Sequence, residues 1–304
     1  MSQRVAGGRE DLSGEGGLPA TARLRDSLIW TTTREVLRNP MGAFGLGVVL
    51  LLLVAGFAAP VLTRYNPIAQ LPGHKLAGPS AQFWFGTDEL SHDLFSRTLY
   101  GLRASLLVSI VAVSTGGALG IVCGFVAGYV RGAAEAVLMR LVDTMFAFPG
   151  LLLAIGILTA VGSSLQGLTL ALGIGAFPGF ARLARAQMLA ERSQDYVLAA
   201  KVLGASGPRI IFRHIARNAL PPLVVHAALA MAGAVLVEAS LGYLGIGIQP
   251  PQPSLGSLIE DSRNYLGSLH YIIFPGIFLV LLLLGLNLLA DAVNESLDPH
   301  RRRR

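Results

Sequence analysis

Residues 195–222 read DYVLAAKVLGASGPRIIFRHIARNALPP, a polar and basic stretch between two strongly apolar runs. Its first half predicts a short helix from Tyr196 to Leu203, followed by Gly204 in the left-handed position at which many helices end. Pro208 predicts the start of a second helix, because the first helical residue does not need the N–H group that proline lacks. The proline pair at 221–222 predicts its end. A helix-turn-helix of this polarity cannot span a bilayer, so we expect it at the membrane surface.

The composition predicts a polytopic membrane protein. Of the 304 residues, 53% are hydrophobic and 14% are charged, and the mean hydropathy is +0.59. About 20 apolar helical residues cross the hydrocarbon layer of a bilayer. Six runs reach that length, at 41–63, 104–130, 136–161, 165–188, 222–247 and 271–292. We therefore predict an all-α fold with six transmembrane helices in a membrane domain at 41–304, preceded by a disordered cytoplasmic tail at 1–25 and an interfacial helix at 26–40.

The distribution of basic residues predicts the orientation of these helices. If the N-terminus is cytoplasmic, 19 of the 24 Arg and Lys residues fall on cytoplasmic segments. The other five are Arg64, Lys75, Arg97, Arg103 and Arg263. Because short cytoplasmic loops carry an excess of Arg and Lys, we expect both termini and the 195–222 stretch in the cytoplasm.

Several kinds of chemistry are missing from the sequence. Cys123 is the single cysteine, and the six histidines never pair at ligand spacing, so we expect no disulfide and no metal site. Neither Lys75 nor Lys201 follows a glycine, which excludes a Walker A phosphate loop. The basic residues form no patch with interleaved aromatics, which argues against nucleic-acid binding. No catalytic arrangement is found. We expect no cofactor in this chain, and any ATP must be bound by another one.

Small residues recur at every fourth position of the second run. The stripe consists of Ala112, Gly116, Gly120, Gly124 and Gly128. Small side chains let two backbones approach closely, which is a main route to helix association in lipid. The stripe therefore predicts packing against another helix.

Acidic residues inside apolar runs are candidates for function, because a charge in lipid is costly. Asp143 lies three residues after Arg140, so the two can pair on one helical face. Glu238 lies deep in the fifth run without an evident partner. We consider Glu238 a candidate for the substrate path or a gate.

The 195–222 stretch resembles the EAA loop of binding-protein-dependent ABC importer permeases. That loop has two alanines, a glycine four residues on, and an Ile-rich basic helix ending in Leu-Pro, and it forms the coupling helices that dock on a cytoplasmic ATPase. The resemblance implies ATPase-coupling roles for Ala199, Ala200, Gly204, Ile215, Leu220 and Pro221. One departure is Leu198, which stands at the position of the family's acidic residue. A salt bridge from this position is therefore not expected.

Other segments resemble the dipeptide and oligopeptide branch of the same family. They are FWFGTDELSHDLFSRTLYGLR at 83–103, MRLVDTMFAFPGLLL at 139–153, EASLGYLGIGIQPPQPSL at 238–255 and NLLADAVNESLDP at 287–299. Within the first segment, Ser91 to Tyr100 predicts a short helix that stops at Gly101. The resemblance extends over residues 35–304.

The resemblance implies a C-type permease subunit with the type I ABC importer fold in the inner (plasma) membrane of a bacterium. Such a chain pairs with a homologous second permease as a heterodimer. An extracytoplasmic binding protein delivers the peptide, and two ABC ATPase subunits bind ATP and Mg²⁺ and drive alternating access. The chain itself would not be an enzyme.

Other functions stay open from the sequence. Relatives with similar motifs carry nickel complexes, haem or oligosaccharides. A secondary transporter driven by an ion gradient would usually show inverted repeats and ionisable groups at the bilayer midplane, and neither is clear here. A membrane scaffold without a transport role would not need the surface helix-turn-helix.

Overall fold

The computed structural model describes residues 33–297, and all regular structure in this part of the chain is helical, which confirms the all-α class. A short helical segment at 33–38 comes first. The helices that follow are α2 (Pro40–Phe57), α3 (Ala59–Leu62), α4 (Leu94–Val130), α5 (Gly132–Phe146), α6 (Gly150–Val161), α7 (Leu165–Arg192), α8 (Asp195–Val202), α9 (Gly207–Arg209), the π-helix η1 (Ile210–Ile215), α10 (Ala216–Tyr243), α11 (Leu255–Ser262) and α12 (His270–Leu297). The predicted tail at 1–25 and the first part of the predicted interfacial helix lie outside the described residues.

Within the described residues, the number of segments that can cross a membrane is the predicted six if the broken pair α5–α6 is counted as one span. Five are long and apolar enough by themselves: α2, α4, α7, α12 and the continuous segment Gly207–Tyr243. The sixth is the pair α5–α6, whose axes meet at 94°. The prediction of one straight helix at 136–161 was therefore wrong. Pro149 precedes α6 and cannot donate an amide hydrogen, and the residue before a proline is disfavoured in the helical region.

The fifth span begins fifteen residues earlier than the predicted 222–247, because the second helix of the 195–222 stretch does not end at its prolines. Pro221 and Pro222 lie inside α10, and α9, η1 and α10 follow one another without a break. Arg217 and Asn218 are exposed. The carbonyl groups that lose their helical partners to the two prolines therefore lie beside water-accessible residues, which reduces the cost of proline in a helix.

The predicted short helix at 91–100 is also part of a longer element. Helix α4 begins at Leu94, and the Asp93 carboxylate accepts a hydrogen bond from the Ser96 amide as its N-terminal cap. The helix does not stop at Gly101. This glycine instead lets the backbone of α11 approach, since a β-carbon there would lie 3.0 Å from the Ser254 carbonyl carbon.

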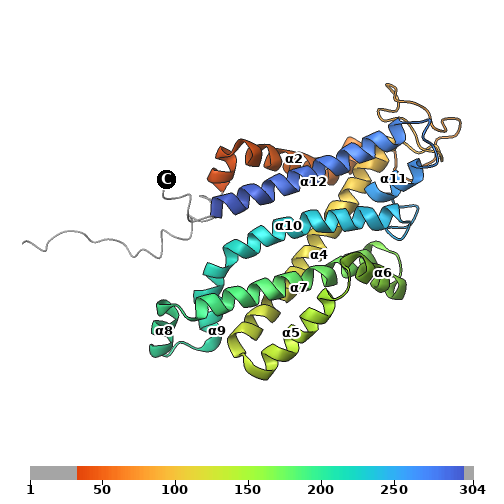
Figure 1. Ribbon diagram of the computed structural model, residues 1–304. Helices are drawn as coiled ribbons and strands as arrows, with labels where there is room; N and C mark the ends of the chain where they lie inside the picture. The colour runs from red at the N-terminus through yellow and green to blue at the C-terminus, as the bar shows by residue number, and fades with distance from the viewer. Residues whose placement is uncertain (1–32, 298–304) are drawn as a thin grey trace, which may run out of the picture.

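Helices α4 and α7 run side by side through the centre of the bundle, and the glycine stripe of α4 lies in their contact (Figure 1). A β-carbon added to Gly120 would lie 2.5 Å from the Phe177 carbonyl oxygen, and one added to Gly128 would lie 2.8 Å from the Met188 β-carbon. Gly116 and Gly124 face the backbone of α7 in the same way. The partner helix of the stripe is thus within the same chain.

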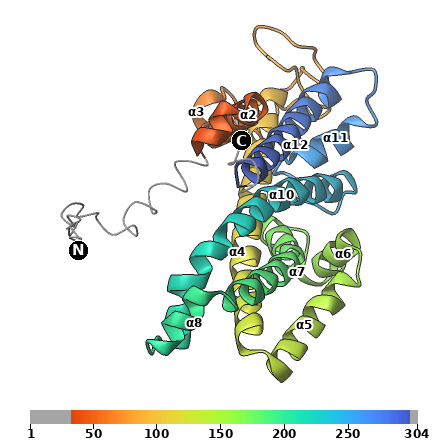
Figure 2. The same cartoon turned by 60° about the vertical axis from the view of Figure 1, so that its left-hand side comes forward.

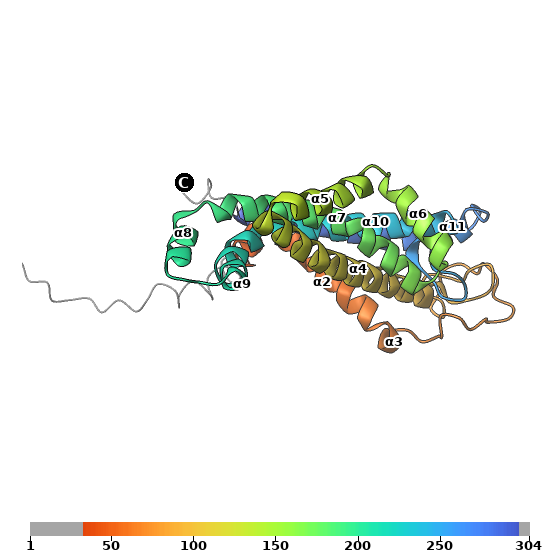
Figure 3. The same cartoon turned by 90° about the horizontal axis from the view of Figure 1, so that it is seen from below.

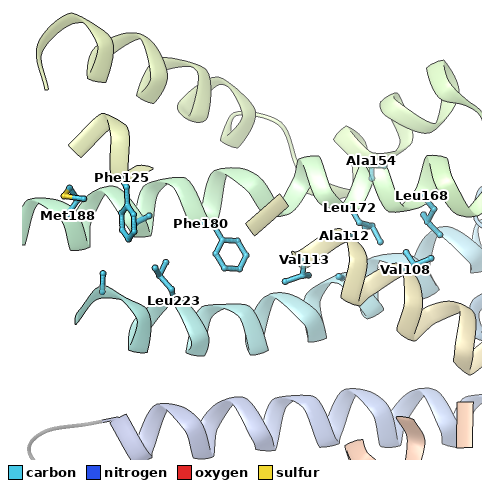
Figure 4. Close-up of a cluster of buried hydrophobic side chains, with 14 of the residues drawn as sticks. Val108, Ala112, Val113, Phe125, Ala154, Leu168, Leu172, Phe180, Met188 and Leu223 are labelled. Atoms are coloured by element: carbon cyan, nitrogen blue, oxygen red, sulfur yellow. The ribbon is translucent and has the colours of Figure 1, made fainter. Parts of the chain in front are cut away.

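The remaining helices flank this central pair. Helix α10 contacts both α4 and α7, α12 pairs with α2 beyond it, and α5 and α6 lie on the opposite side (Figures 1 and 2). The main core lies between α4, α7 and α10, where Phe125, Phe180, Met188 and Leu223 belong to one cluster of buried side chains (Figure 4). Helices α8 and α9 extend from this packed part of the bundle.

Both ends of the described chain lie at the same end of the bundle as α8 (Figure 3). The Asn39 side-chain amide donates a hydrogen bond to a Glu295 carboxylate oxygen at 2.7 Å, which joins the start of α2 to the end of α12. Helix α11 and residues 63–93 lie at the other end. An even number of crossings brings the two chain ends together in this way.

Candidate functional site

Helix α8 projects from the bundle and ends in a tight turn at Gly204, as the sequence predicts. The Gly204 amide donates to the Lys201 carbonyl, and the Ala205 amide donates to the Ala200 carbonyl, each at 3.0 Å. This pair of hydrogen bonds is the Schellman motif, and Gly204 has the positive φ of +78° that the motif requires. The turn reverses the chain into α9 with the last carbonyl groups of α8 satisfied.

Side chains from three elements fix α8 to its base. The Tyr196 hydroxyl donates a short hydrogen bond to the carboxylate of Glu191, at the end of α7. The Asn218 amide, on α10, donates to the same carboxylate oxygen at 3.4 Å. Burial, followed by the bond to Glu191, raises the pKa of Tyr196 to about 12, so this hydroxyl remains a donor at physiological pH. Helix α8 is thus tied to both α7 and α10.

A second set of contacts joins the end of α7 to the end of α4 beside the turn. The Arg192 guanidinium donates to the Tyr129 carbonyl at 2.9 Å and lies over the Tyr129 ring at 5.8 Å from its centre. The Tyr129 hydroxyl lies 2.9 Å from where a β-carbon on Gly207 would be. The α8–α9 turn therefore packs, through Gly207, against the place where the ends of α4 and α7 are joined.

The outer side of this element carries exposed apolar side chains, which we call the apolar tip. It consists of Leu198 (49% exposed), Val202 (88%), Leu203 (86%) and Phe212 (68%). Leu198 and Val202 are four residues apart and lie on one face of α8. Exposed basic residues accompany them, namely Lys201, Arg209, Arg213 and Arg217. The combination favours a partner surface with an apolar pocket and acidic residues around it.

The six residues with expected ATPase-coupling roles divide into two groups. Ala199, Gly204 and Leu220 are exposed. Ala200 is 8% exposed and Ile215 is 0% exposed, and both pack into the core of this chain. Pro221 is half-buried. The first group is thus accessible to a partner, whereas Ala200 and Ile215 are enclosed within this chain.

The apolar tip itself was missed by sequence reasoning. Leu198 was noted only as a departure from an acidic residue, and Val202 and Leu203 only as helical residues. The available signal was two adjacent large apolar residues immediately before a glycine turn, in an otherwise polar stretch. Such residues are rarely exposed together without a partner.

Glu238, the candidate for a path or gate, is fully buried between α4, α10 and α11. The Ser105 hydroxyl donates to its Oε2 at 2.7 Å, while its Oε1 has no hydrogen-bond partner among the described residues. The exposed fraction of Glu238 is 0%, so in this conformation the carboxyl group faces no open space. Its partner Ser105 had not been foreseen, because it lies 133 residues away in the sequence.

A charged network lies at the opposite end of the bundle. The buried Asp88 carboxylate contacts the His92 ring at 2.8 Å and the Arg97 guanidinium at 3.1 Å, and Arg97 lies 4.0 Å from Asp261 of α11. Burial and then the negative charge of Glu89 raise the pKa of Asp261 to about 7, against the opposing effect of Arg97. The network joins the segment before α4 to α11.

Comparison with known proteins identifies the family. The family model of binding-protein-dependent transport system inner membrane components matches residues 120–303, and that of the N-terminal transmembrane domain of oligopeptide transport permease C matches residues 27–79. The chain belongs to the family of binding-protein-dependent transport system inner membrane components. This confirms the resemblance seen in the sequence. Members of this family are transport subunits, and the family implies a second permease, ATPase subunits and a substrate-binding protein as partners.

Individual relatives cover most of this inner membrane component. A dipeptide transport system permease protein of Alkalihalophilus pseudofirmus is 38% identical over 267 residues, covering 88% of both chains. A probable D,D-dipeptide transport system permease protein of Escherichia coli K12 is 39% identical, covering 86% of this chain and 88% of the relative. A chain of the MetNI methionine ABC transporter, solved in inward-facing conformations, shares the fold with a TM-score of 0.55 and 22% identity, covering 66% of this chain and 97% of that one.

Proposed function

We propose that this chain is one of two homologous permease subunits of an ATP-driven importer for di- and oligopeptides. The relatives' names supply the substrate class. A binding protein outside the membrane would deliver the peptide, and the two permeases would enclose it. Two ABC ATPase subunits would bind ATP and Mg²⁺ in the cytoplasm, since this chain has no phosphate loop. Both termini and α8 would lie on the cytoplasmic side, where the excess of Arg and Lys favours them.

The observation that carries the proposal is the projecting α8–Gly204–α9 element with its apolar tip. A docking element must be exposed where it touches its partner and rigidly connected where it transmits force. Val202 and Leu203 are more than four-fifths exposed. Tyr196 connects the same element to α7 and, through the shared Glu191 carboxylate, to α10, while Gly207 lies against Tyr129 of α4. An ATPase that displaces α8 would therefore displace α4, α7 and α10 with it.

Loss of the apolar tip tests the docking role. Val202→Asp would place a charge in an apolar contact, which is costly when it is buried against a partner. We expect this variant to reach the membrane and pair with the second permease, but to lose ATPase copurification and ATP-dependent uptake. Val61→Asp is the matched control, because Val61 is 87% exposed and lies at the opposite end of the bundle. Equal ATPase binding in both variants would contradict the proposal.

Uptake assays test the substrate class and the energy source. Proteoliposomes containing the complete complex should accumulate labelled di- and oligopeptides only when ATP is supplied on the side of the membrane that carries the ATPase subunits. Nickel complexes, haem and oligosaccharides serve as competing substrates. Transport by this chain alone under a proton gradient without ATP would contradict the proposal in favour of a secondary transporter.

A further inference from the structure

An ion pair between two membrane-spanning segments is open to the surroundings of the chain. The Arg182 guanidinium of α7 lies 2.8 Å from the Asp143 carboxylate of α5, and their side chains are 54% and 60% exposed. The guanidinium also covers the Phe146 ring, 4.1 Å from its centre. The sequence had suggested Arg140 as the partner of Asp143, and that expectation was wrong, because Arg182 on the neighbouring helix takes this role.

This pair lies within the membrane and not at its surface. Arg182 precedes the end of α7 at Arg192 by ten residues, which corresponds to about 15 Å of helix. Asp143 follows the start of α5 at Gly132 by eleven residues, or about 16 Å. On the neighbouring α4, the level of Arg182 is that of residues 120–124, well inside its apolar run.

Lipid is a poor environment for such a pair. Charged side chains within spans almost always face a bundle interior or a water-filled cavity, because their transfer into hydrocarbon is costly. Arginine can extend toward the headgroups, but the short Asp143 side chain cannot. Since both side chains are more than half exposed here, the face that carries them must be covered by something other than lipid.

A break in the same span gives a second, independent indication. Helix α5 ends at Phe146 and α6 begins at Gly150, and residues 147–149 between them are exposed. Non-helical backbone at membrane depth is tolerated only where protein covers it or where it lines a water-filled cavity. Discontinuous spans near the midplane are also where transporters hold their substrates. The break lies four residues beyond Asp143 along the chain.

A cavity of about 680 Å³ adjoins this region. Its walls come from α4 and α7, and Met145 of α5 reaches it beside the break. Most of the lining is apolar. Gln166 supplies an amide group, and the Thr115 and Thr169 hydroxyls, which donate to carbonyl oxygens of their own helices, can act as acceptors. A few polar groups in an apolar wall suit a ligand that has both amide groups and apolar side chains.

We propose that the face of α5 and α7 bearing the Arg182–Asp143 pair lines the aqueous translocation pathway, where the pair forms a charged constriction. This rests on the proposed function, in which the chain encloses its substrate together with a sister subunit. A peptide carries an ammonium and a carboxylate at its two ends. Each can replace one partner of the exposed pair, so that neither protein charge is left unpaired as the peptide passes.

A second ion pair on the same two helices provides a matched control. Arg185 of α7 lies 2.6 Å from Glu135 of α5, but the side chains are only 34% and 17% exposed. Arg185 lies three residues nearer the end of α7, or about 4.5 Å closer to the membrane surface. This pair joins the helices without presenting its charges to the proposed pathway.

Thiol accessibility tests the proposal directly. In a Cys123→Ser background, Asp143→Cys and Phe148→Cys variants are treated with a membrane-impermeant, positively charged methanethiosulfonate in inside-out vesicles. Val280→Cys on α12 is the control, because Val280 is 62% exposed and has only apolar surroundings in its span. We expect both test positions to react at least about tenfold faster than the control, since the thiolate forms readily only in water. Equally slow reaction at all three positions would overturn the proposal.

The measurement separates this proposal from the proposed function. It requires neither peptide nor ATP, and Phe148→Cys keeps the ion pair intact if Asp143→Cys fails to fold. Fast labelling without any peptide uptake would support the aqueous face and contradict the peptide substrate. Peptide uptake without labelling at either position would contradict the aqueous face and leave the peptide importer standing.

Uptake by charge variants tests the role of the pair as a constriction. We expect Arg182→Gln and Asp143→Asn to lower peptide uptake severalfold at unchanged ATPase copurification. The exchanged pair, Arg182→Asp with Asp143→Arg, should recover part of it. Arg185→Gln should change uptake less than Arg182→Gln. Normal uptake in both single variants would contradict the role of the pair as a constriction.

Discussion

Replacing Gly120 by alanine would measure how much of the fold depends on the contact between α4 and α7. The added β-carbon would lie 2.5 Å from the Phe177 carbonyl oxygen and 2.8 Å from the Phe180 β-carbon, whereas 3.4 Å is ordinary contact. The two helices would have to separate by about 0.9 Å at this level, or distort locally. Overpacking of this kind costs about 1–3 kcal/mol, and Gly120→Leu should cost more.

A glycine on the partner helix isolates this steric effect from helix propensity. Gly175 of α7 has no heavy atom within 4 Å of its added β-carbon. Gly175→Ala should therefore stabilise the protein by up to about 1 kcal/mol, because alanine is the better helix former.

The two variants and the parent are purified in detergent and compared by thermal denaturation. Size-exclusion chromatography is the readout. We expect Gly120→Ala to denature at a lower temperature than the parent and Gly175→Ala at the same or a higher one. If Gly120→Ala proved as stable as Gly175→Ala, close packing along the glycine stripe would not be a source of stability.

Three other measurements address the turn, the topology and the charged network. Gly204→Val should abolish ATP-dependent uptake, because valine is strained at the positive φ of the turn. Gly204→Asn should retain most of the uptake, since asparagine tolerates this conformation. Equal uptake in the two variants would show that the turn is not needed. Single cysteines at Ser80 and Ser193 in a Cys123→Ser background should react with an impermeant thiol reagent from opposite sides of the membrane, and reaction from one side only would contradict six crossings. The pKa of Asp261 is about 7 in the fold against 3.8 for a free aspartate, so the folded protein binds its proton more tightly and loses this stability as the pH rises through that interval. Thermal stability should therefore fall between about pH 4 and 7, and the fall should be smaller in Asp261→Asn.

The membrane crossings could be predicted because length and apolarity are local properties of the sequence. The break at 147–149 could not, since the run 136–161 is interrupted by charge only at Arg140 and Asp143, and apolar residues continue on both sides of the break. Pro149 was visible, but a proline inside a span can also be accommodated, as Pro178 is in α7. Which outcome occurs depends on the neighbouring helices and not on the proline itself.

The candidate site, too, could be predicted only in part from the sequence. The positive φ of Gly204 followed from the sequence, because few other residues adopt the conformation that ends a helix in this way. The rotation of α8 did not, and it decides that Ala200 faces the core while Ala199 faces outward. That rotation is set by Tyr196, whose partner Glu191 belongs to another helix. Likewise, Asp143 pairs with a residue 39 positions away and not with its helical neighbour.

The uninterrupted segment from Gly207 to Tyr243 has the properties of a lever. Its 37 residues extend from the turn beside α8 to the opposite end of the bundle. At 1.5 Å per residue its path is about 55 Å long, and it bends where α9 and η1 pass into α10 (Figures 1 and 2). The far arm carries Glu238 and Gly242, which are packed against α4 and α11. In the proposed orientation, a push on the cytoplasmic end of this segment would move the end at the external mouth, with no need for a relay of side chains between them.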